Sequence, residues 1–274
     1  MKIIVAGIIA ATAFLSCSII GLADVENADN PACVPMKRTD WSEPVTKMWA
    51  DKATKQKATE GGIDVLFLGD SITQLWYNDP RWPNGQEAWD KNYKPLKAIN
   101  LGVAGDTTCH LIWRIGEGRM IEGLTPKVTI LLIGVNNITG RGKGSSPGSG
   151  TPENIAAAIV LILDNLKKQM PDTKILLLGI FPAFPDQSDS KWLEKIHKTN
   201  KIIAEQADYK KIFYLDIGNK LLSSDGKLDK EIIRDGIHLS EKGYEIWAEN
   251  MNPYLLDLLN NNGKGKMWDA VKGK

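Results

Sequence analysis

The chain has 274 residues, of which 43% are hydrophobic, and its 34 basic and 33 acidic residues give a formal net charge of +1. A chain of this length and composition can bury one substantial globular core. The charges are balanced and scattered along the sequence. This argues against a nucleic-acid partner, because proteins that bind nucleic acids normally present a basic patch or stripe.

The first 23 residues form an apolar N-terminal segment. Lys2 is the only charged residue before Asp24, and Gly21-Leu22-Ala23 supplies the small residues that precede a signal-peptidase site. We predict a signal peptide over residues 1–23, cleaved after Ala23, and therefore a secreted or periplasmic protein without stable membrane insertion. Two alternatives stay open: an uncleaved membrane anchor, since the segment is about long enough to span a bilayer, and lipid attachment at Cys17.

Cleavage after Ala23 would leave two cysteines, Cys33 and Cys109. An oxidising compartment would permit a disulfide between them, but free cysteines are also often simply buried. Together with the three histidines of the chain, they show no spacing typical of a zinc site.

From Ile63 onward, short apolar runs alternate with amphipathic stretches. Apolar runs with almost no charge are typical of strands buried on both faces of a parallel sheet, and their alternation with helices predicts an α/β sandwich. We expect one domain over 61–260, after an N-terminal helical extension (24–60, with a helix near 42–58) and before a polar C-terminal tail (261–274). The expected strands are 63–69, 97–102, 127–135, 174–181 and 212–217, and the main expected helices begin at Pro152, near 189 and near 240.

Polar residues and glycines follow three of the predicted strands, at the edge where open α/β sheets bind their ligands. Ser71 follows the first strand, Gly105 the second and Asn136 the third, while Asp235 precedes His238 by three positions near the C-terminus. A hydroxyl, an imidazole and a carboxylate are the groups needed for acyl transfer through serine, and glycine N–H and asparagine NH₂ groups can stabilise an oxyanion.

Each of these residues also has a structural interpretation. A serine after a strand is often a helix N-cap, Asp235 can cap a turn, and Asn136 can bond to its own loop. Gly105 can be an ordinary turn glycine. Their joint position at successive strand ends favours the catalytic interpretation.

Four short segments resemble the sequence blocks of the SGNH or GDSL-type hydrolases. Gly69–Thr73 resembles the first block, Gly102–Asp106 the second, Gly134–Asn137 the third and Asp235–His238 the fifth. The resemblance covers about residues 63–255. It is greatest to the branch similar to platelet-activating factor acetylhydrolase, which implies small acyl groups, acetyl above all. The sequence departs from the usual pattern in having Ile72-Thr73 after the serine, and Asn137 where Asp is commoner.

The resemblance implies a flavodoxin-like fold, a three-layer α/β/α sandwich with five parallel strands in the order 2-1-3-4-5. That order places the first and third strands side by side, so that Ser71 and Asn136 would face one cleft. The implied nucleophile is Ser71, with His238 and Asp235 completing the triad. The implied oxyanion donors are the N–H groups of Ser71 and Gly105 and the Asn136 side chain. No metal and no organic cofactor is implied.

The sequence therefore predicts a serine esterase that hydrolyses short-chain acyl esters of small molecules or carbohydrates. A carbohydrate is considered because Trp76, Trp82 and Trp113 lie near predicted strand ends, and aromatic rings stack on sugars. Three alternatives stay open: a lysophospholipase or lipase activity, a non-catalytic glycan-binding module on the same fold, and a flavodoxin-like phosphate or nucleotide binder. The sequence does not indicate the oligomeric state.

Overall fold

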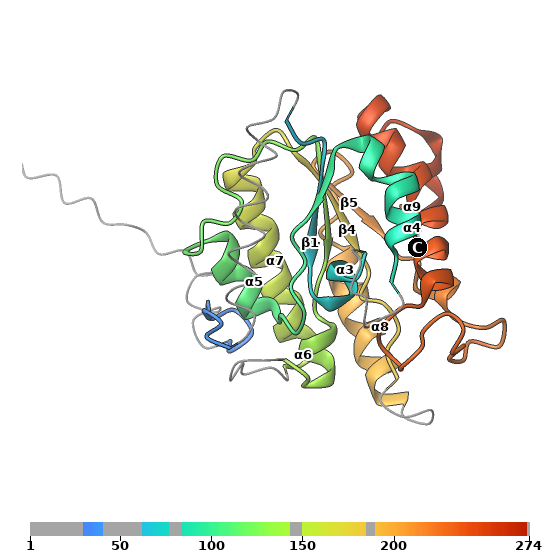
Figure 1. The fold of residues 1–274 in the computed structure, drawn as a ribbon. Coiled ribbons are helices and arrows are strands. Elements are labelled where there is room, and N and C mark those ends of the chain that lie inside the picture. Colours follow the sequence, from blue (N-terminus) through green and yellow to red (C-terminus); the bar gives the residue numbers. More distant parts are fainter. Residues whose placement is uncertain (1–29, 41–61, 77–83, 143–149, 185–189, 273–274) are drawn as a thin grey trace, which may run out of the picture.

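We describe the protein from a computed structural model (Figure 1). The predicted signal peptide, the expected helix near 42–58 and most of the polar loop 141–150 lie outside the described residues, so the first two stay predictions. Within the described part of the chain, no helix combines the length and the hydropathy that crossing a bilayer requires. The described residues are 30–40, 62–76, 84–142, 150–184 and 190–272.

The centre of the molecule is a five-stranded parallel sheet with the predicted order, β2-β1-β3-β4-β5. The strand residues are buried except for the half-buried Lys174, because helices cover both faces of the sheet. All five strands lie within the predicted apolar runs, although several runs continue past the strand ends. The strands are β1 (Val65–Gly69), β2 (Ala98–Asn100), β3 (Val128–Leu132), β4 (Lys174–Leu178) and β5 (Ile212–Leu215).

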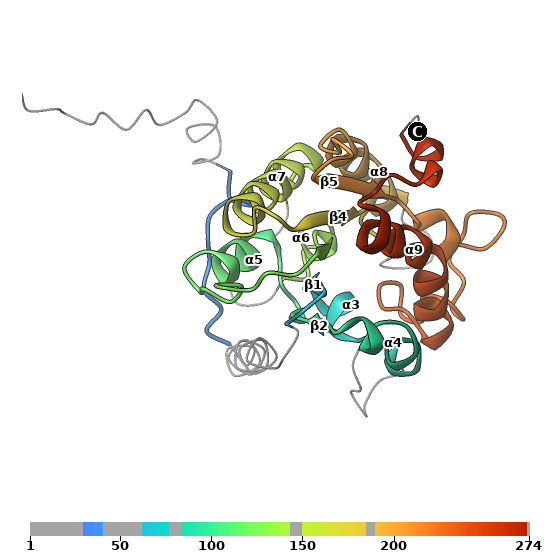
Figure 2. The same ribbon diagram turned by 90° about the horizontal axis from the view of Figure 1, so that it is seen from above.

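Helices form a layer on each side of this sheet, which confirms the three-layer sandwich (Figures 1 and 2). The chain runs from β1 to β2 in one direction and then returns past β1 to β3, β4 and β5. Because such crossovers are right-handed, this reversal puts the connections on opposite faces. One layer contains α5 (Thr108–Ile115), α7 (Pro152–Gln169) and α8 (Ser190–Ala204), and the other contains α4 (Gln86–Asn92) and α9 (Glu241–Asn261).

The two longest helices each follow a residue whose side chain caps the N-terminus. The Thr151 hydroxyl accepts a hydrogen bond from the Asn154 N–H at 3.2 Å, and Pro152 occupies the first turn of α7. The Ser240 hydroxyl accepts from the Gly243 N–H at 3.2 Å at the start of α9. The shorter helical elements are α3 (Ser71–Gln74), α6 (Val135–Thr139), η1 (Lys94–Leu96), η2 (Gly218–Leu221) and η3 (Lys266–Ala270).

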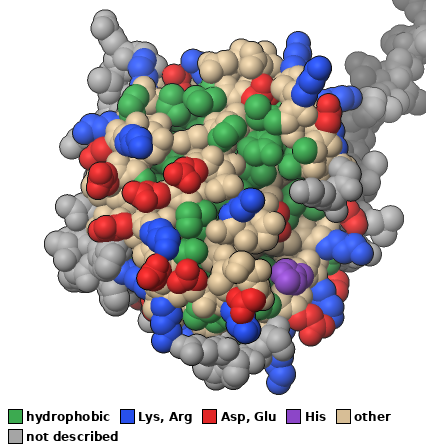
Figure 3. Space-filling model, turned by 90° about the vertical axis from the view of Figure 1, so that its right-hand side faces the viewer, with side chains coloured by type: hydrophobic (Ala, Val, Ile, Leu, Met, Phe, Trp, Pro, Cys, Tyr) green, Lys and Arg blue, Asp and Glu red, His purple; other side chains and the backbone are tan. Residues whose placement is uncertain are grey.

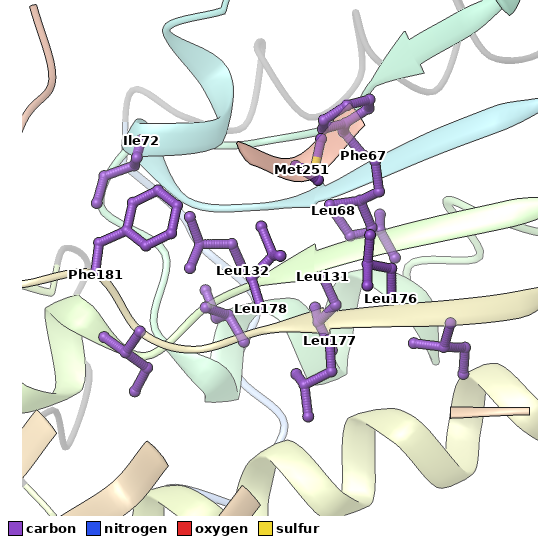
Figure 4. Packing of buried hydrophobic residues seen from close by; sticks show 14 of the residues in the cluster. Phe67, Leu68, Ile72, Leu131, Leu132, Leu176, Leu177, Leu178, Phe181 and Met251 are labelled. Carbon is purple, nitrogen blue, oxygen red and sulfur yellow. The ribbon is translucent and has the colours of Figure 1, made fainter. Parts of the chain in front are cut away.

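Two kinds of side chain fill the space between the layers. Buried leucines of β1, β3 and β4 lie next to one another, with Phe181 and Met251 beside them (Figure 4). Aromatic rings pack between β1 and the layer of α4 and α9, with Trp76 and Trp247 ring centroids 4.8 Å apart. Trp76 is fully buried, which corrects the suggestion that it contacts a sugar. Trp82 lies outside the described residues.

The face of the molecule that carries α9 displays acidic and basic side chains interspersed with apolar ones (Figure 3). Opposite charges are paired there, as between Lys242 Nζ and Glu231 Oε2 at 2.8 Å. Exposed pairs of this kind contribute little to stability. The mixture of signs matches the scattered charges of the sequence.

The C-terminal segment 261–274 is more than the polar tail that the sequence suggests. It contains η3, whose Trp268 is fully buried. The indole Nε1–H of Trp268 donates to Asp257 Oδ2 on α9 at 2.8 Å, and its ring lies 4.8 Å from that of Phe213 on β5. The part of this segment that the structure describes, up to residue 272, therefore packs on the domain and extends its core beyond residue 260.

Replacing Trp268 tests whether the C-terminal segment stabilises the fold. We expect Trp268→Ala to lower the free energy of unfolding by about 3–5 kcal/mol, because it empties a buried aromatic site. The neighbouring Met267 is 37% exposed, so Met267→Ala is the matched control and should change stability little. Urea denaturation of both variants measures the difference, and equal effects would contradict the assignment.

Candidate active site

The predicted nucleophile Ser71 is the first residue of α3 and is separated from the end of β1 by Asp70 alone. The N-cap position, which was an alternative interpretation of Ser71, is occupied by Asp70, whose Oδ1 accepts a hydrogen bond from the Ile72 N–H at 2.9 Å. Ser71 is therefore not needed as the cap. Because Ser71 follows the C-terminal end of β1, it lies at the carboxyl edge of the sheet, where it is 7% exposed.

The structure brings Ser71, His238 and Asp235 into one hydrogen-bonded chain. Ser71 Oγ lies 2.9 Å from His238 Nε2 although the two residues are 167 positions apart. His238 Nδ1 lies 2.7 Å from Asp235 Oδ2. A carboxylate can only accept from Nδ1–H, so the partners assign the proton to Nδ1 and leave Nε2 to accept from the serine hydroxyl.

The carboxylate of Asp235 is held in its ionised form. Burial by itself would raise the pKa of Asp235, but hydrogen bonds from the side chain and backbone of His238 and from the backbone of Ile237 outweigh it and hold this pKa well below its usual range. Its Oδ1 accepts the two backbone bonds at 2.8 and 3.0 Å, and its Oδ2 faces the imidazole. A charge fixed in this way can orient the ring and stabilise an imidazolium.

The turn between Asp235 and His238 depends on Gly236. Its φ of +88° lies in the left-handed region, and a Cβ there would lie 2.0 Å from the carbonyl oxygen of Phe184. The same glycine accepts a hydrogen bond from the Phe184 N–H at 2.6 Å. Only glycine satisfies both the backbone angle and the close approach, so the turn is locked against the segment that follows β4.

The predicted oxyanion residues Gly105 and Asn136 lie on the loop before α5 and on α6. Gly105 adopts a φ of +80°. β3 ends at Leu132, so the prediction of a strand over 127–135 was too long, and Asn136 lies in the first turn of a short helix. Asn136 Nδ2 donates to the carbonyl of Asp106 at 2.9 Å. The asparagine thus bonds to the neighbouring loop rather than to its own.

Side chains tie this loop to the helix that carries Ser71. Asn100 Nδ2 donates to the carbonyl of Thr73 at 2.6 Å, and the Ala104 N–H donates to Gln74 Oε1 at 2.7 Å. Asn100, the last residue of β2, also accepts through Oδ1 from the Gly102 N–H at 2.8 Å. Ser71 and the loop that carries Gly105 are therefore held in a fixed relation.

A buried ion-pair network, which the sequence analysis missed, lies beneath the loop. Asp106 is fully buried, with Oδ2 2.6 Å from Arg114 Nε and Oδ1 3.1 Å from Arg38 Nη1. Burial raises the pKa of Asp106, and the two guanidiniums oppose that rise. Arg114 also donates to the carbonyls of Leu101 and Gly69 at 2.9 and 3.1 Å. Nothing in the sequence marks Arg38 as a partner of Asp106.

The unusual Asn137 links α6 to the start of α5. Its Oδ1 accepts from the Thr108 N–H at 3.0 Å, and its Nδ2 donates to Thr108 Oγ1 at 2.9 Å. The Thr108 hydroxyl gives its own hydrogen to the carbonyl of Ala32 at 2.8 Å. Because that hydroxyl must accept from residue 137, an amide fits here and an ionised carboxylate does not.

Cys33 and Cys109 are both buried, and neither forms a disulfide in this structure. The Cys109 thiol donates to the carbonyl of Pro31 at 3.1 Å. Burial, followed by the proximity of Cys109, raises the pKa of Cys33 to about 11. In the described residues, no three His, Cys, Asp or Glu side chains are grouped closely enough to hold a metal ion.

The sequence profile of the GDSL-like lipase/acylhydrolase family matches residues 67–246. The chain belongs to this family. It is 29% identical over 245 residues to platelet-activating factor acetylhydrolase IB subunit alpha1 from Rattus norvegicus, covering 86% of this chain and 94% of the relative. Its fold matches that of a GDSL-like lipase from Bacteroides thetaiotaomicron, with a TM-score of 0.61 and 20% identity over 77% of this chain and 97% of that chain.

A second solved structure with the same fold is a catalytic mutant of Axe2, an acetylxylan esterase from Geobacillus stearothermophilus. The TM-score is 0.53 and the identity 17%, with 72% of this chain and 96% of that chain covered. As a member of the GDSL acylhydrolase family, the protein is a carboxylic ester hydrolase.

Asp70 gives the site a pH dependence that can be measured. Asp70 is 1% exposed. Burial raises its pKa to about 7, although the Ile72 N–H, His238 and Arg114 each act to lower it. An unfolded Asp has a pKa of about 3.9. The folded protein therefore binds more protons than the unfolded chain between these values, and the stability that this group contributes below about pH 4 is lost as the pH rises to about 7.

Asp70→Asn keeps an acceptor for the Ile72 N–H and removes the titration. We expect the wild-type unfolding free energy minus that of the variant to fall as the pH rises from 4 to 7, by at most about 1.4 kcal/mol per pH unit. Urea denaturation of both proteins across this range measures the difference. A difference that stays constant with pH would rule out the proton uptake.

Proposed function

We propose that this family member is a serine esterase for short acyl esters, acetyl above all, with Ser71 as its nucleophile. The observation that carries the proposal is the 2.9 Å contact between Ser71 Oγ and His238 Nε2, continued at 2.7 Å from His238 Nδ1 to Asp235. A hydroxyl that faces an imidazole, itself oriented by a carboxylate, is the arrangement that activates serine for attack on an ester.

The reaction proceeds in two acyl-transfer steps. His238 Nε2 takes the proton of the Ser71 hydroxyl while Oγ bonds to the ester carbonyl carbon, and the carbonyl electrons move to its oxygen. The carbonyl re-forms as the bond to the alcohol breaks, and His238 returns the proton to the departing alcohol. Water then repeats the sequence on the acyl-enzyme and releases the acid and free Ser71. Asp235 stays ionised throughout.

We assign the stabilisation of the oxyanion to three N–H groups. Within the described residues, the backbone N–H groups of Ser71 and Gly105 do not donate to another protein group. The Asn136 amide gives one N–H to the Asp106 carbonyl and has a second one for the substrate. Donors held in place before the reaction stabilise the developing charge without reorganisation.

Two comparisons support the assignment of residues and of the acyl group. Catalytic mutants of the Geobacillus stearothermophilus acetylxylan esterase replace an Asp and a His that are three positions apart, which is the spacing of Asp235 and His238. Both that esterase and the Rattus norvegicus relative are named for the removal of acetyl groups. The half-buried Trp113 is the one described tryptophan of the three considered that could contact a sugar.

Removing the nucleophile tests the mechanism directly. We expect Ser71→Ala to lower kcat on p-nitrophenyl acetate by at least about 1,000-fold while the protein keeps its circular dichroism spectrum. Ser223→Ala, which removes an exposed hydroxyl from a surface turn, should retain full activity. A fluorophosphonate should label the wild type at Ser71. Unchanged turnover in Ser71→Ala, or an unlabelled wild type, would favour the glycan-binding alternative.

The acyl preference is tested with p-nitrophenyl esters of increasing chain length. We expect kcat/KM to be highest for acetate and to fall towards octanoate, because we assign the site to acetyl groups. Steady-state rates at subsaturating substrate give the comparison. A rise of kcat/KM with chain length would favour the lipase alternative.

A further inference from the structure

The peptide bond between Ala104 and Gly105 accepts a hydrogen bond from a cationic side chain at its carbonyl oxygen. Arg38 Nη1 donates to the carbonyl oxygen of Ala104 at 2.6 Å. The N–H of this same peptide unit belongs to Gly105, the residue that the proposed function uses as an oxyanion donor. The Arg38 guanidinium therefore binds the carbonyl end of the peptide whose N–H would bind the reacting oxygen.

We propose that Arg38 is a positioning residue for catalysis: it fixes and polarises the Ala104–Gly105 peptide so that the Gly105 N–H points at the oxyanion. This inference rests on the proposed function. It adds a requirement for the N-terminal segment 30–40, which lies outside the part of the chain that matches the family, 67–246.

Peptide geometry gives the first reason. In a trans peptide the C=O and N–H bonds point in opposite directions, so fixing the carbonyl of Ala104 also fixes the direction of the Gly105 N–H. Glycine allows the backbone to adopt several conformations, and Gly105 has a φ of +80°. A peptide unit beside such a residue can rotate away unless a partner holds it.

Arg38 is itself held rigidly enough to act as that partner. Its Nε and Nη2 contact the two carboxylate oxygens of Asp40 at 3.0 and 2.6 Å, and its Nη1 also contacts Asp106 at 3.1 Å. The side chain is 4% exposed. A planar guanidinium bound on two edges cannot rotate freely, so the orientation of the peptide is set before substrate arrives.

The charge of Arg38 adds to the effect of its geometry. A cation at a carbonyl oxygen polarises the peptide, and hydrogen bonds linked in this way strengthen one another. The Gly105 N–H becomes a better donor as a result. Asp106 and Asp40 balance the positive charges of Arg38 and Arg114, so the network as a whole is neutral. The polarising effect of Arg38 acts on the Ala104–Gly105 peptide that it contacts.

The N-terminal segment is fastened to the domain by contacts that do not involve Arg38. The Thr108 hydroxyl donates to the carbonyl of Ala32 at 2.8 Å, and the Met36 N–H donates to the carbonyl of Cys109 at 3.2 Å. Asn30 Nδ2 donates to the carbonyl of Asn154 at 2.9 Å. These anchors should keep the segment in place when Arg38 is replaced, so a variant can report on the peptide itself.

The test compares Arg38→Ala and Arg38→Lys with the wild type on p-nitrophenyl acetate. We expect kcat to fall about 10- to 100-fold in Arg38→Ala, less than the loss of a whole donor, while KM changes less than about 3-fold because the donor acts in the transition state. Arg38→Lys keeps the charge but lacks the planar guanidinium, so its kcat should lie between those of the wild type and Arg38→Ala. The neighbouring Lys37→Ala should have wild-type activity.

Two further measurements separate positioning from a general loss of structure. Added guanidinium should restore kcat in Arg38→Ala, and ammonium at the same ionic strength should not. An alkylboronic acid, which forms a tetrahedral anion on the serine, should bind Arg38→Ala more weakly by about the factor lost in kcat, since it needs the same donor. Arg38→Lys provides the same kcat and boronate comparison if Arg38→Ala does not fold.

A folded Arg38 variant with wild-type kcat and wild-type boronate affinity would overturn the positioning role. Equal losses in substrate and boronate binding without guanidinium rescue would overturn it too, because they indicate a structural effect. The two proposals fail separately. If Ser71→Ala remains active, the proposed function is wrong whatever Arg38 does. If Ser71→Ala is inactive and Arg38→Ala is fully active, only the role of Arg38 is lost.

Discussion

The geometry of the site depends on the ion pairs that the buried carboxylate of Asp106 forms with Arg114 and Arg38. The carboxylate binds Arg114, which also bonds to the carbonyl of Gly69, two residues before Ser71, and it binds Arg38, which bonds to the peptide of Gly105. One charge thus connects the end of β1 to the loop after β2. Removing one partner would leave an uncompensated buried charge, which is costly in a protein interior.

The topology of the sheet explains why residues so distant in sequence meet at this point. Strand order reverses after β2, and the loops on either side of such a reversal diverge and leave room for a ligand. Ser71 and Gly105 come from the two strands that precede the reversal, and Asn136 follows β3. His238 reaches the same edge from the turn before α9, which Gly236 locks against Phe184.

The sequence predicted the strands and the Ser71, His238 and Asp235 contacts because these depend on local patterns and on a recognisable family resemblance. It missed features that arise only from tertiary packing. Arg38 has no pattern around it, Trp268 follows a polar stretch yet is fully buried, and Trp76 belongs to the core rather than to a sugar site. The predicted third strand was extended to Val135, the first residue of α6, because Ile133 and Val135 continue the apolar run of β3.

The directed chain of hydrogen bonds from Asn137 through Thr108 to Ala32 has a consequence for how this protein differs from other family members. The Thr108 hydroxyl accepts from Asn137 and gives its single hydrogen to the Ala32 carbonyl, so it cannot also donate to residue 137 without breaking the bond to Ala32. With an Asp in place of Asn137, the threonine hydroxyl would turn its hydrogen towards the carboxylate, and the carbonyl of Ala32 would lose its donor. Whether residue 137 is an amide or an acid therefore affects how the N-terminal segment is held at Ala32.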